Sequence, residues 1–253
     1  MKIQIYSDIH LEFYKTFPKI EPLADILFLA GDIGKLHMDN YKEFFDYVSK
    51  NWKYCFYVLG NHEYYHSKKN FEKLNLEYKE FFKNYNNIHL LDRDYYILDD
   101  ILIIGCTMWT KVDNNIINII NDFQHIKIKE NNRTVKMNIE TFNSLHQKDK
   151  DFLLNIIIEN KSFSKIIILT HFPLIQENVS NPIYNNQPEY IKNYFSNNIS
   201  LDINCFQRMY IIGGHTHYSY NFKKDNITYI SNQFGYKSEL QNTNMKINGL
   251  FEI

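Results

Sequence analysis

The chain has 253 residues, 44% of them hydrophobic and 23% charged, and this balance excludes disorder over most of its length. One domain over residues 1–253 is expected, because this length is generous for one hydrophobic core and tight for two. The formal net charge of -1 gives no global field that would attract a polyanion such as a long nucleic acid.

The expected elements alternate between short apolar strands and longer polar helices, which is typical of stacked β-α-β units. In chain order, these are strands over Lys2–Tyr6 and Asp25–Ala30, a helix over Asp39–Asn51, a strand over Tyr54–Leu59, a helix over Phe71–Tyr85, a strand over Ile101–Gly105, helices over Asn114–Phe123 and Asn138–Asn160, and strands over Lys165–Thr170 and Met209–Ile212. Antiparallel strands over Tyr218–Phe222, Ile227–Ile230 and Lys246–Phe251 are expected to close a sheet edge. The pattern predicts an α/β fold.

Side chains that can bind metal ions follow the expected strands. They are Asp8, His10, Asp32, Asn61, His171, His215 and His217. Open α/β sheets bind ligands at the carboxyl ends of their strands, so we expect these side chains to converge from the strand ends of one sheet. The donors are carboxylate, imidazole and amide groups without thiolate, which suits Mn, Fe, Zn, Co or Ni. Seven donors suffice for two divalent ions that share a carboxylate.

These motifs resemble those of the calcineurin-like metallophosphoesterases. The five blocks of that family are Asp-x-His, Gly-Asp, Gly-Asn-His-Glu, His and Gly-His-x-His, and all occur here in order between residues 8 and 217. The run Gly60–Tyr65 also resembles a bacterial and viral branch of the family. The resemblance implies a four-layer α-β-β-α sandwich of two mixed β-sheets flanked by helices. It also implies hydrolysis of a phosphoester by two metal ions that activate a bridging water.

The resemblance further implies a role for each residue of the blocks. One ion would be held by Asp8, His10 and His217, and a second by Asn61, His171 and His215, with Asp32 bridging the two. His62 would not be a ligand. It would act instead as a proton donor or as a stabiliser of the transition state.

The favoured substrate is a small, nucleotide-like phosphodiester, because the sequence has no basic track for a long nucleic acid. Trp109, Tyr64 and Tyr65 fit two interpretations equally, as core aromatics or as cleft residues that stack on a base. A phosphomonoesterase or protein phosphatase is the main alternative. A nuclease and a catalytically inactive interaction scaffold of the same fold are further ones.

A competing motif is His62-Glu63-Tyr64-Tyr65-His66, which matches the His-Glu-x-x-His signature of zinc proteases. That chemistry needs both histidines one turn apart on a helix. Here the motif follows an apolar strand and a Gly-Asn break, and paired tyrosines are poor helix formers, so the phosphoesterase interpretation is preferred.

The cysteine residues and the N-terminus indicate in which cellular compartment the protein is expected. Cys55, Cys106 and Cys205 are widely spaced, which argues against a disulfide framework. The N-terminus does not resemble a signal peptide, and no run of 18 apolar residues could span a membrane. We therefore expect a cytoplasmic protein without a membrane partner, and a viral protein of the host cytoplasm fits this expectation.

Overall fold

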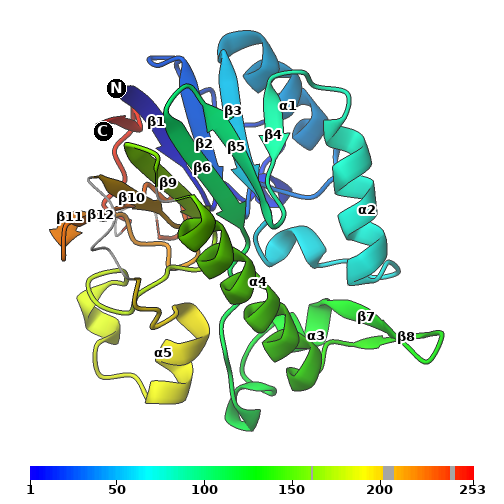
Figure 1. The fold of residues 1–253 in the computed structure, drawn as a ribbon. Helices are drawn as coiled ribbons and strands as arrows, with labels where there is room; N and C mark the ends of the chain where they lie inside the picture. Colours follow the sequence, from blue (N-terminus) through cyan, green and yellow to red (C-terminus); the bar gives the residue numbers. More distant parts are fainter. Residues whose placement is uncertain (161, 202–207, 240–242) are drawn as a thin grey trace.

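Two packed β-sheets with helices on both outer sides form the body of the protein (Figure 1). The computed structural model describes residues 1–160, 162–201, 208–239 and 243–253. The expected α-β-β-α sandwich of two mixed sheets is confirmed. Cys205 lies outside the described residues, whereas Cys55 and Cys106 are buried free thiols.

The first sheet brings three of the metal-binding blocks to one edge. Its strands, in spatial order, are β13 (Leu250–Glu252), β1 (Lys2–Tyr6), β2 (Ile26–Ala30), β3 (Tyr54–Val58) and β4 (Ile88–Leu90). Strands β1 to β4 are parallel, and β13 pairs antiparallel to β1. Every residue of β2 is buried, as expected for a parallel strand that is covered on both faces. The carboxyl ends of β1, β2 and β3 therefore meet at the same edge.

The second sheet brings the remaining blocks to the same end of the sandwich. Its strands, in spatial order, are β11 (Asn221–Lys224), β12 (Ile227–Ile230), β10 (Met209–Ile212), β9 (Lys165–Thr170), β6 (Ile101–Cys106) and β5 (Asp94–Leu98). The central strands β12, β10, β9 and β6 are parallel, and the edge strands β11 and β5 are antiparallel to their neighbours.

The core between the sheets is apolar and closely packed. Ile5, Phe28 and Phe56 of the first sheet belong to one buried cluster with Ile167 and Ile212 of the second. Side chains alternate along a strand, so the neighbouring residues of these strands face the outer helices instead. This packing fixes the two sheets relative to each other, and with them the two halves of the site.

Helices cover the outer faces. Helices α1 (Asp39–Asn51) and α2 (Phe71–Phe82) lie beside the first sheet, and α4 (Ile139–Glu159) lies across the second (Figure 1). Asn70 and Asn138 cap α2 and α4 by accepting hydrogen bonds from backbone N–H groups. The short helices α3 (Asp122–His125) and α5 (Glu189–Phe195) lie beyond the carboxyl ends of the strands (Figure 1).

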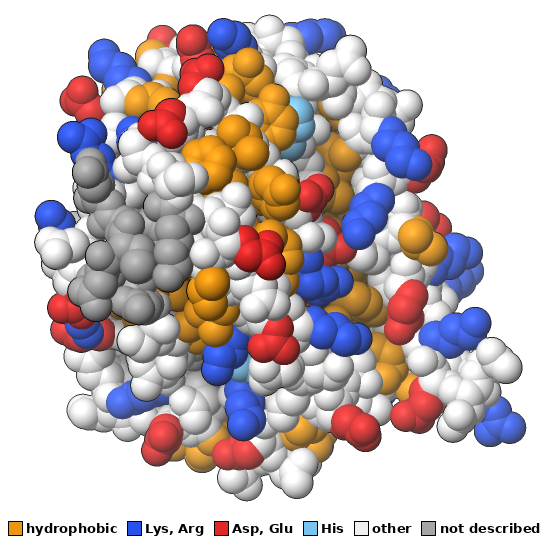
Figure 2. Space-filling view, in the orientation of Figure 1, with side chains coloured by type: hydrophobic (Ala, Val, Ile, Leu, Met, Phe, Trp, Pro, Cys, Tyr) orange, Lys and Arg blue, Asp and Glu red, His pale blue; other side chains and the backbone are white. Residues whose placement is uncertain are grey.

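Among the described residues, no helix is long and apolar enough to cross a membrane. Positive and negative side chains are interspersed over the face seen in Figure 2.

Several sequence-based expectations need correction. The helix expected over Asn114–Phe123 is instead a 3-10 turn over Asn114–Ile116 followed by α3, because the Asn and Ile residues that make up most of this segment are weak helix formers. The strand expected at Tyr218 begins only at Asn221, and the one expected over Lys246–Phe251 is confined to β13. Strands β4 and β5, helix α5 and the hairpin of β7 (Lys127–Glu130) and β8 (Arg133–Lys136) were not expected.

Candidate metal centre and active site

The seven expected metal ligands lie together, but they come from two sheets and not from one. Asp8 and His10 follow β1, Asp32 follows β2, and Asn61 follows β3. His171 follows β9 and the His215–His217 pair follows β10, both in the other sheet. The expectation of a single sheet is wrong because β9 and β10 pair with β6 and β12 in a second sheet and not with β1, β2 and β3. The site therefore lies at the seam between the two sheets, where the carboxyl ends of β1, β2 and β3 meet those of β9 and β10.

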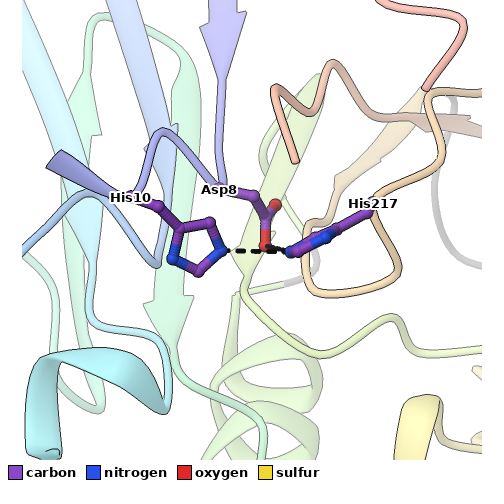
Figure 3. Close-up of side chains that lie close together, drawn as sticks. All are labelled: Asp8, His10 and His217. Atoms are coloured by element: carbon purple, nitrogen blue, oxygen red, sulfur yellow. Dashed lines mark hydrogen bonds and ion pairs between the residues drawn. The ribbon is translucent and has the colours of Figure 1, made fainter. Parts of the chain in front are cut away.

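The first cluster contains Asp8, His10 and His217, whose ligand atoms lie within 4.8 Å of one another. Figure 3 shows the two imidazoles pointing at each other beside the Asp8 carboxylate. Nε2 of His10 is 3.1 Å from Nε2 of His217, which is in turn 3.6 Å from Oδ1 of Asp8. The other ring nitrogens face carboxylates, at 3.3 Å from Glu12 and 2.5 Å from Glu239. These outer contacts orient both rings so that their Nε2 atoms point to the place between them where an ion would bind.

The second cluster contains Asp32, His171 and His215, again with ligand atoms within 4.8 Å. Nε2 of His171 is 3.5 Å from Oδ2 of Asp32 and 3.0 Å from Oδ1 of Asn61. Nδ1 of His171 is 2.8 Å from the Ala30 carbonyl oxygen, which fixes the ring. The same Asp32 oxygen is 3.9 Å from Nε2 of His10. Asp32 thus lies between the clusters, where a bridging ligand would be needed.

The chemistry of this donor set fits divalent cations. Nε2 of His215 is buried without a hydrogen-bond partner among the described residues. Burial raises the pKa of Asp32 well above its usual range, and the nearby Glu63 and Asp8 carboxylates raise it further. Burial also lowers the pKa of His171 and of His215, which keeps both imidazoles in the neutral form that binds metals.

Backbone conformation is unusual at these strand ends. Five of the seven residues have positive φ angles near 50–70°: Asp8, His10, Asp32, His215 and His217. Such a conformation costs of the order of 1–3 kcal/mol for a residue other than glycine, and strain of this kind gathers at functional sites. Gly60 is needed for a steric reason, because a Cβ there would lie 2.2 Å from Oδ1 of Asp32.

His62 lies at the edge of both clusters, with its side chain 13% exposed. Its Nδ1 is 3.2 Å from Oε1 of Glu12, its Nε2 is 3.3 Å from the Tyr236 hydroxyl, and its ring stacks on Tyr65. It is also close enough to His10 and Asp32 to form a third possible metal-binding group. The pKa of Glu12 is held well below its usual range, since hydrogen bonds from His10 and His62 outweigh the effect of burial.

Sequence reasoning missed two buried carboxylates that shape the site. Glu12 connects His10 and His62. Glu63 accepts hydrogen bonds from the backbone N–H groups of Asp32 and Gly60 at 3.0 and 2.8 Å, so it ties the end of β2 to the end of β3. Glu63 stood in the sequence as part of the protease-like motif, which gave no hint of this structural role.

The protease interpretation is wrong. His62–Tyr64 is a 3-10 turn and not part of an α-helix. Nδ1 of His66 accepts hydrogen bonds from the backbone N–H groups of Lys68 and Lys69, and its ring lies beside His37. No possible metal-binding group in the described part of the chain includes His66.

A cavity of about 690 Å³ opens beside the two clusters. Tyr65 lines it, as one interpretation expected. Tyr64 and Trp109 do not: each is 1% exposed and packs in the core, where their rings lie 5.9 Å apart. The expectation that these two stack on a substrate is corrected, because both side chains fill space between α2 and α4. The far wall is formed by residues 119–121, 176–187 and α5.

Comparisons with known proteins agree with this geometry. The sequence profile of the calcineurin-like phosphoesterases matches residues 1–219. An uncharacterized protein of Acanthamoeba polyphaga mimivirus is 34% identical over 268 residues, covering 96% of this chain and 95% of that protein. The fold is similar to that of phosphopantetheinyl hydrolase from Mycobacterium tuberculosis, with a TM-score of 0.70 and 11% identity over 100% of this chain and 95% of that one. The profile match includes all seven metal-binding candidates and His62.

Proposed function

This chain belongs to the calcineurin-like phosphoesterase family and is therefore a metal-dependent phosphoester hydrolase, and we propose that its substrate is a small phosphodiester. Two divalent ions are proposed to bind at the seam between the sheets, through Asp8, His10, Asp32, Asn61, His171, His215 and His217. When bound, such ions supply Lewis acidity that activates water and neutralises phosphoryl charge.

The proposed role of His62 is proton donation to the leaving oxygen. Glu12 holds Nδ1 of the ring, and Tyr65 supports one face of it. Nε2 is therefore directed toward Tyr236, which lines the cavity together with His62. A positioned proton donor of this kind contributes roughly 10²–10⁴-fold to the rate.

The lining of the cavity is the observation that carries the substrate proposal. Its volume of about 690 Å³ is in the usual range for sites that bind small molecules. Apart from Asp32 and the histidines, the charged side chains that line it are Lys192, Glu177 and Glu239, and Glu239 also contacts Nδ1 of His217. This wall offers one cation against two anions, so it does not favour the second charge of a monoester or the many charges of a long nucleic acid.

The rest of the wall favours an uncharged, partly aromatic substituent. Ile119, Tyr184 and Phe195 present apolar surface, and Gln176 and Gln187 present amide groups. Aromatic rings and amides suit stacking on a base and hydrogen bonding to its edge. These features support a nucleotide-like diester as the favoured substrate class.

The test is a comparison of initial rates with Mn-loaded protein on one panel. The panel contains bis-p-nitrophenyl phosphate, p-nitrophenyl phosphate, cyclic and linear dinucleotides, single-stranded DNA and a phosphopeptide. A phosphopantetheinyl diester is included because the similar M. tuberculosis structure is that of a phosphopantetheinyl hydrolase. Asp32→Asn is the control variant, since it removes one charge from the proposed bridging ligand.

We expect a small diester to give the highest kcat/KM, and Asp32→Asn to abolish turnover. A monoester or the phosphopeptide cleaved well above every diester would establish a phosphatase instead. Metal-loaded protein that binds two ions and cleaves no substrate would favour the inactive scaffold.

A further inference from the structure

Asp122 is a buried carboxylate beside the metal centre to which the proposed reaction assigns no role. It is the first residue of α3 and is completely buried, in a segment that sequence reasoning expected to be a plain helix. A buried carboxylate needs hydrogen-bond donors to offset the loss of water. The groups that donate hydrogen bonds to Asp122 therefore indicate what role this carboxylate has.

Three side chains donate to Asp122. The Tyr65 hydroxyl lies 2.5 Å and Nδ2 of Asn61 lies 2.7 Å from Oδ1 of Asp122, and the Tyr194 hydroxyl lies 3.0 Å from Oδ2. Nδ2 of Asn61 is also 3.2 Å from the Tyr65 oxygen and 3.4 Å from the Tyr194 oxygen. The amide nitrogen of Asn61 is thus enclosed by oxygen atoms.

This arrangement decides which end of the Asn61 amide faces the metal centre. A carboxylate only accepts hydrogen bonds, so a flipped amide would place oxygen against oxygen at about hydrogen-bond distance. In the observed orientation Oδ1 faces Nε2 of His171 at 3.0 Å. The oxygen is the atom of an amide that binds hard and borderline cations.

We propose that Asp122 is a positioning residue that holds the Asn61 carbonyl oxygen toward the second metal ion. The inference rests on the proposed function, in which Asn61 is a ligand. Tyr194 lies on α5 and lines the cavity, so the same carboxylate also joins the metal centre to the wall that faces the substrate. Groups that orient metal ligands in this way change metal affinity by about 10- to 100-fold when they are removed.

The first experiment measures metal binding and not activity. Mn²⁺ is titrated calorimetrically into metal-free wild type, Asp122→Ala and the control Asp113→Ala. Asp113 is a matched control because, among the described residues, its carboxylate accepts only a local backbone hydrogen bond, from the Asn115 N–H. For Asp122→Ala we expect one of two binding events to weaken by about 10- to 100-fold while the other stays nearly unchanged. Two wild-type affinities in Asp122→Ala would overturn the proposal.

A charge-swapped pair covers the case in which Asp122→Ala fails to fold. Asn61→Asp alone places two carboxylates in contact, so it should weaken the second ion. The double variant combines Asn61→Asp with Asp122→Asn, which reverses the hydrogen bond. The amide at position 122 now donates to one oxygen of the carboxylate at position 61. The other oxygen of that carboxylate stays free to bind the ion. The double variant should bind the second ion more tightly than Asn61→Asp alone.

A double variant no better than the single one would also overturn the proposal, because contact between positions 61 and 122 would then have no effect on the second ion. Failure of the proposed function looks different. In that case the wild type itself would bind fewer than two ions or would cleave no phosphoester.

Discussion

At the scale of single residues, the geometry leaves two roles for His62, metal ligand or proton donor, and an experiment can separate them. It is close enough to His10 and Asp32 to act as a ligand, yet Glu12 already occupies its Nδ1. We predict that His62→Asn keeps two ions bound and lowers kcat by about 100- to 10,000-fold, as expected for loss of a proton donor. Elemental analysis and kcat on the best diester check this. His66→Ala serves as the control and should retain full activity. A loss of one ion in His62→Asn would make His62 a ligand and contradict the prediction.

The limits of sequence reasoning at this scale follow from distance along the chain. Asp8, Asp32 and His171 could be predicted because each directly follows an apolar strand, a local signal. The roles of Glu12 and Asp122 were missed because they depend on distant partners: Glu12 contacts His62 and Asp122 accepts from Asn61, 50 and 61 residues away in the sequence. A carboxylate that orients a ligand is visible only once the fold brings the pair together.

At the scale of elements, α4 holds a buried acid that should affect stability. Asp149 accepts hydrogen bonds from Nη1 of Arg93 at 2.7 Å and from the Trp109 N–H at 3.2 Å. Burial raises the pKa of Asp149 to about 6, although Arg93 opposes the shift. A pKa raised on folding means that the contribution to stability is full below the unfolded value of about 3.9 and is lost as pH rises through about 6.

We therefore predict a pH-dependent difference between wild type and Asp149→Asn, whose amide does not titrate. The unfolding free energy of wild type relative to the variant should fall by about 2 kcal/mol between pH 4 and pH 7. Urea unfolding of both metal-free proteins at several pH values across that range measures it. If the unfolding free energy of wild type relative to Asp149→Asn rises with pH, the Arg93 ion pair has a larger effect on the pKa of Asp149 than burial has, contrary to this prediction.

Elements also differ in how well the sequence predicts them. Strands β1, β9, β10 and β12 and helix α1 match their predicted bounds, because the strands are short apolar runs and the helix has an apolar face of helical period. The β7–β8 hairpin was missed although its turn residues, Asn131 and Asn132, both have the positive φ that a tight hairpin turn requires. Its strands are mostly polar and exposed, so no apolar period marked them. Helix α5 has seven residues, too few for a clear pattern.

At the scale of the whole molecule, two sheets share one site, and this predicts coupling between metal binding and global stability. His171 and the His215–His217 pair follow strands of the second sheet, and the other expected ligands follow strands of the first sheet. Ions bound across the seam would oppose separation of the sheets. Binding to the folded state alone adds about 2.7 kcal/mol at an ion concentration one hundred times Kd.

The charge distribution leads to the last prediction, which concerns salt. The net charge is -1, opposite charges are interspersed over the face in Figure 2, and Lys192 is the one lysine or arginine among the described residues that line the cavity. Each phosphate contact made by a cation contributes a slope of about -0.7 to log K against log salt for single strands. With one such contact, kcat/KM on a small diester should fall by at most about threefold between 50 and 200 mM salt.

The measurement is kcat/KM on the best small diester at several potassium chloride concentrations, with a long single-stranded DNA added as a competitor. Lys192→Gln should flatten the remaining salt dependence, because it removes the cation that lines the cavity. The DNA should compete weakly, since it would find no row of cations there. A steep salt dependence together with strong inhibition by DNA would require a basic track outside the cavity, and the preferred substrate would then be a nucleic acid.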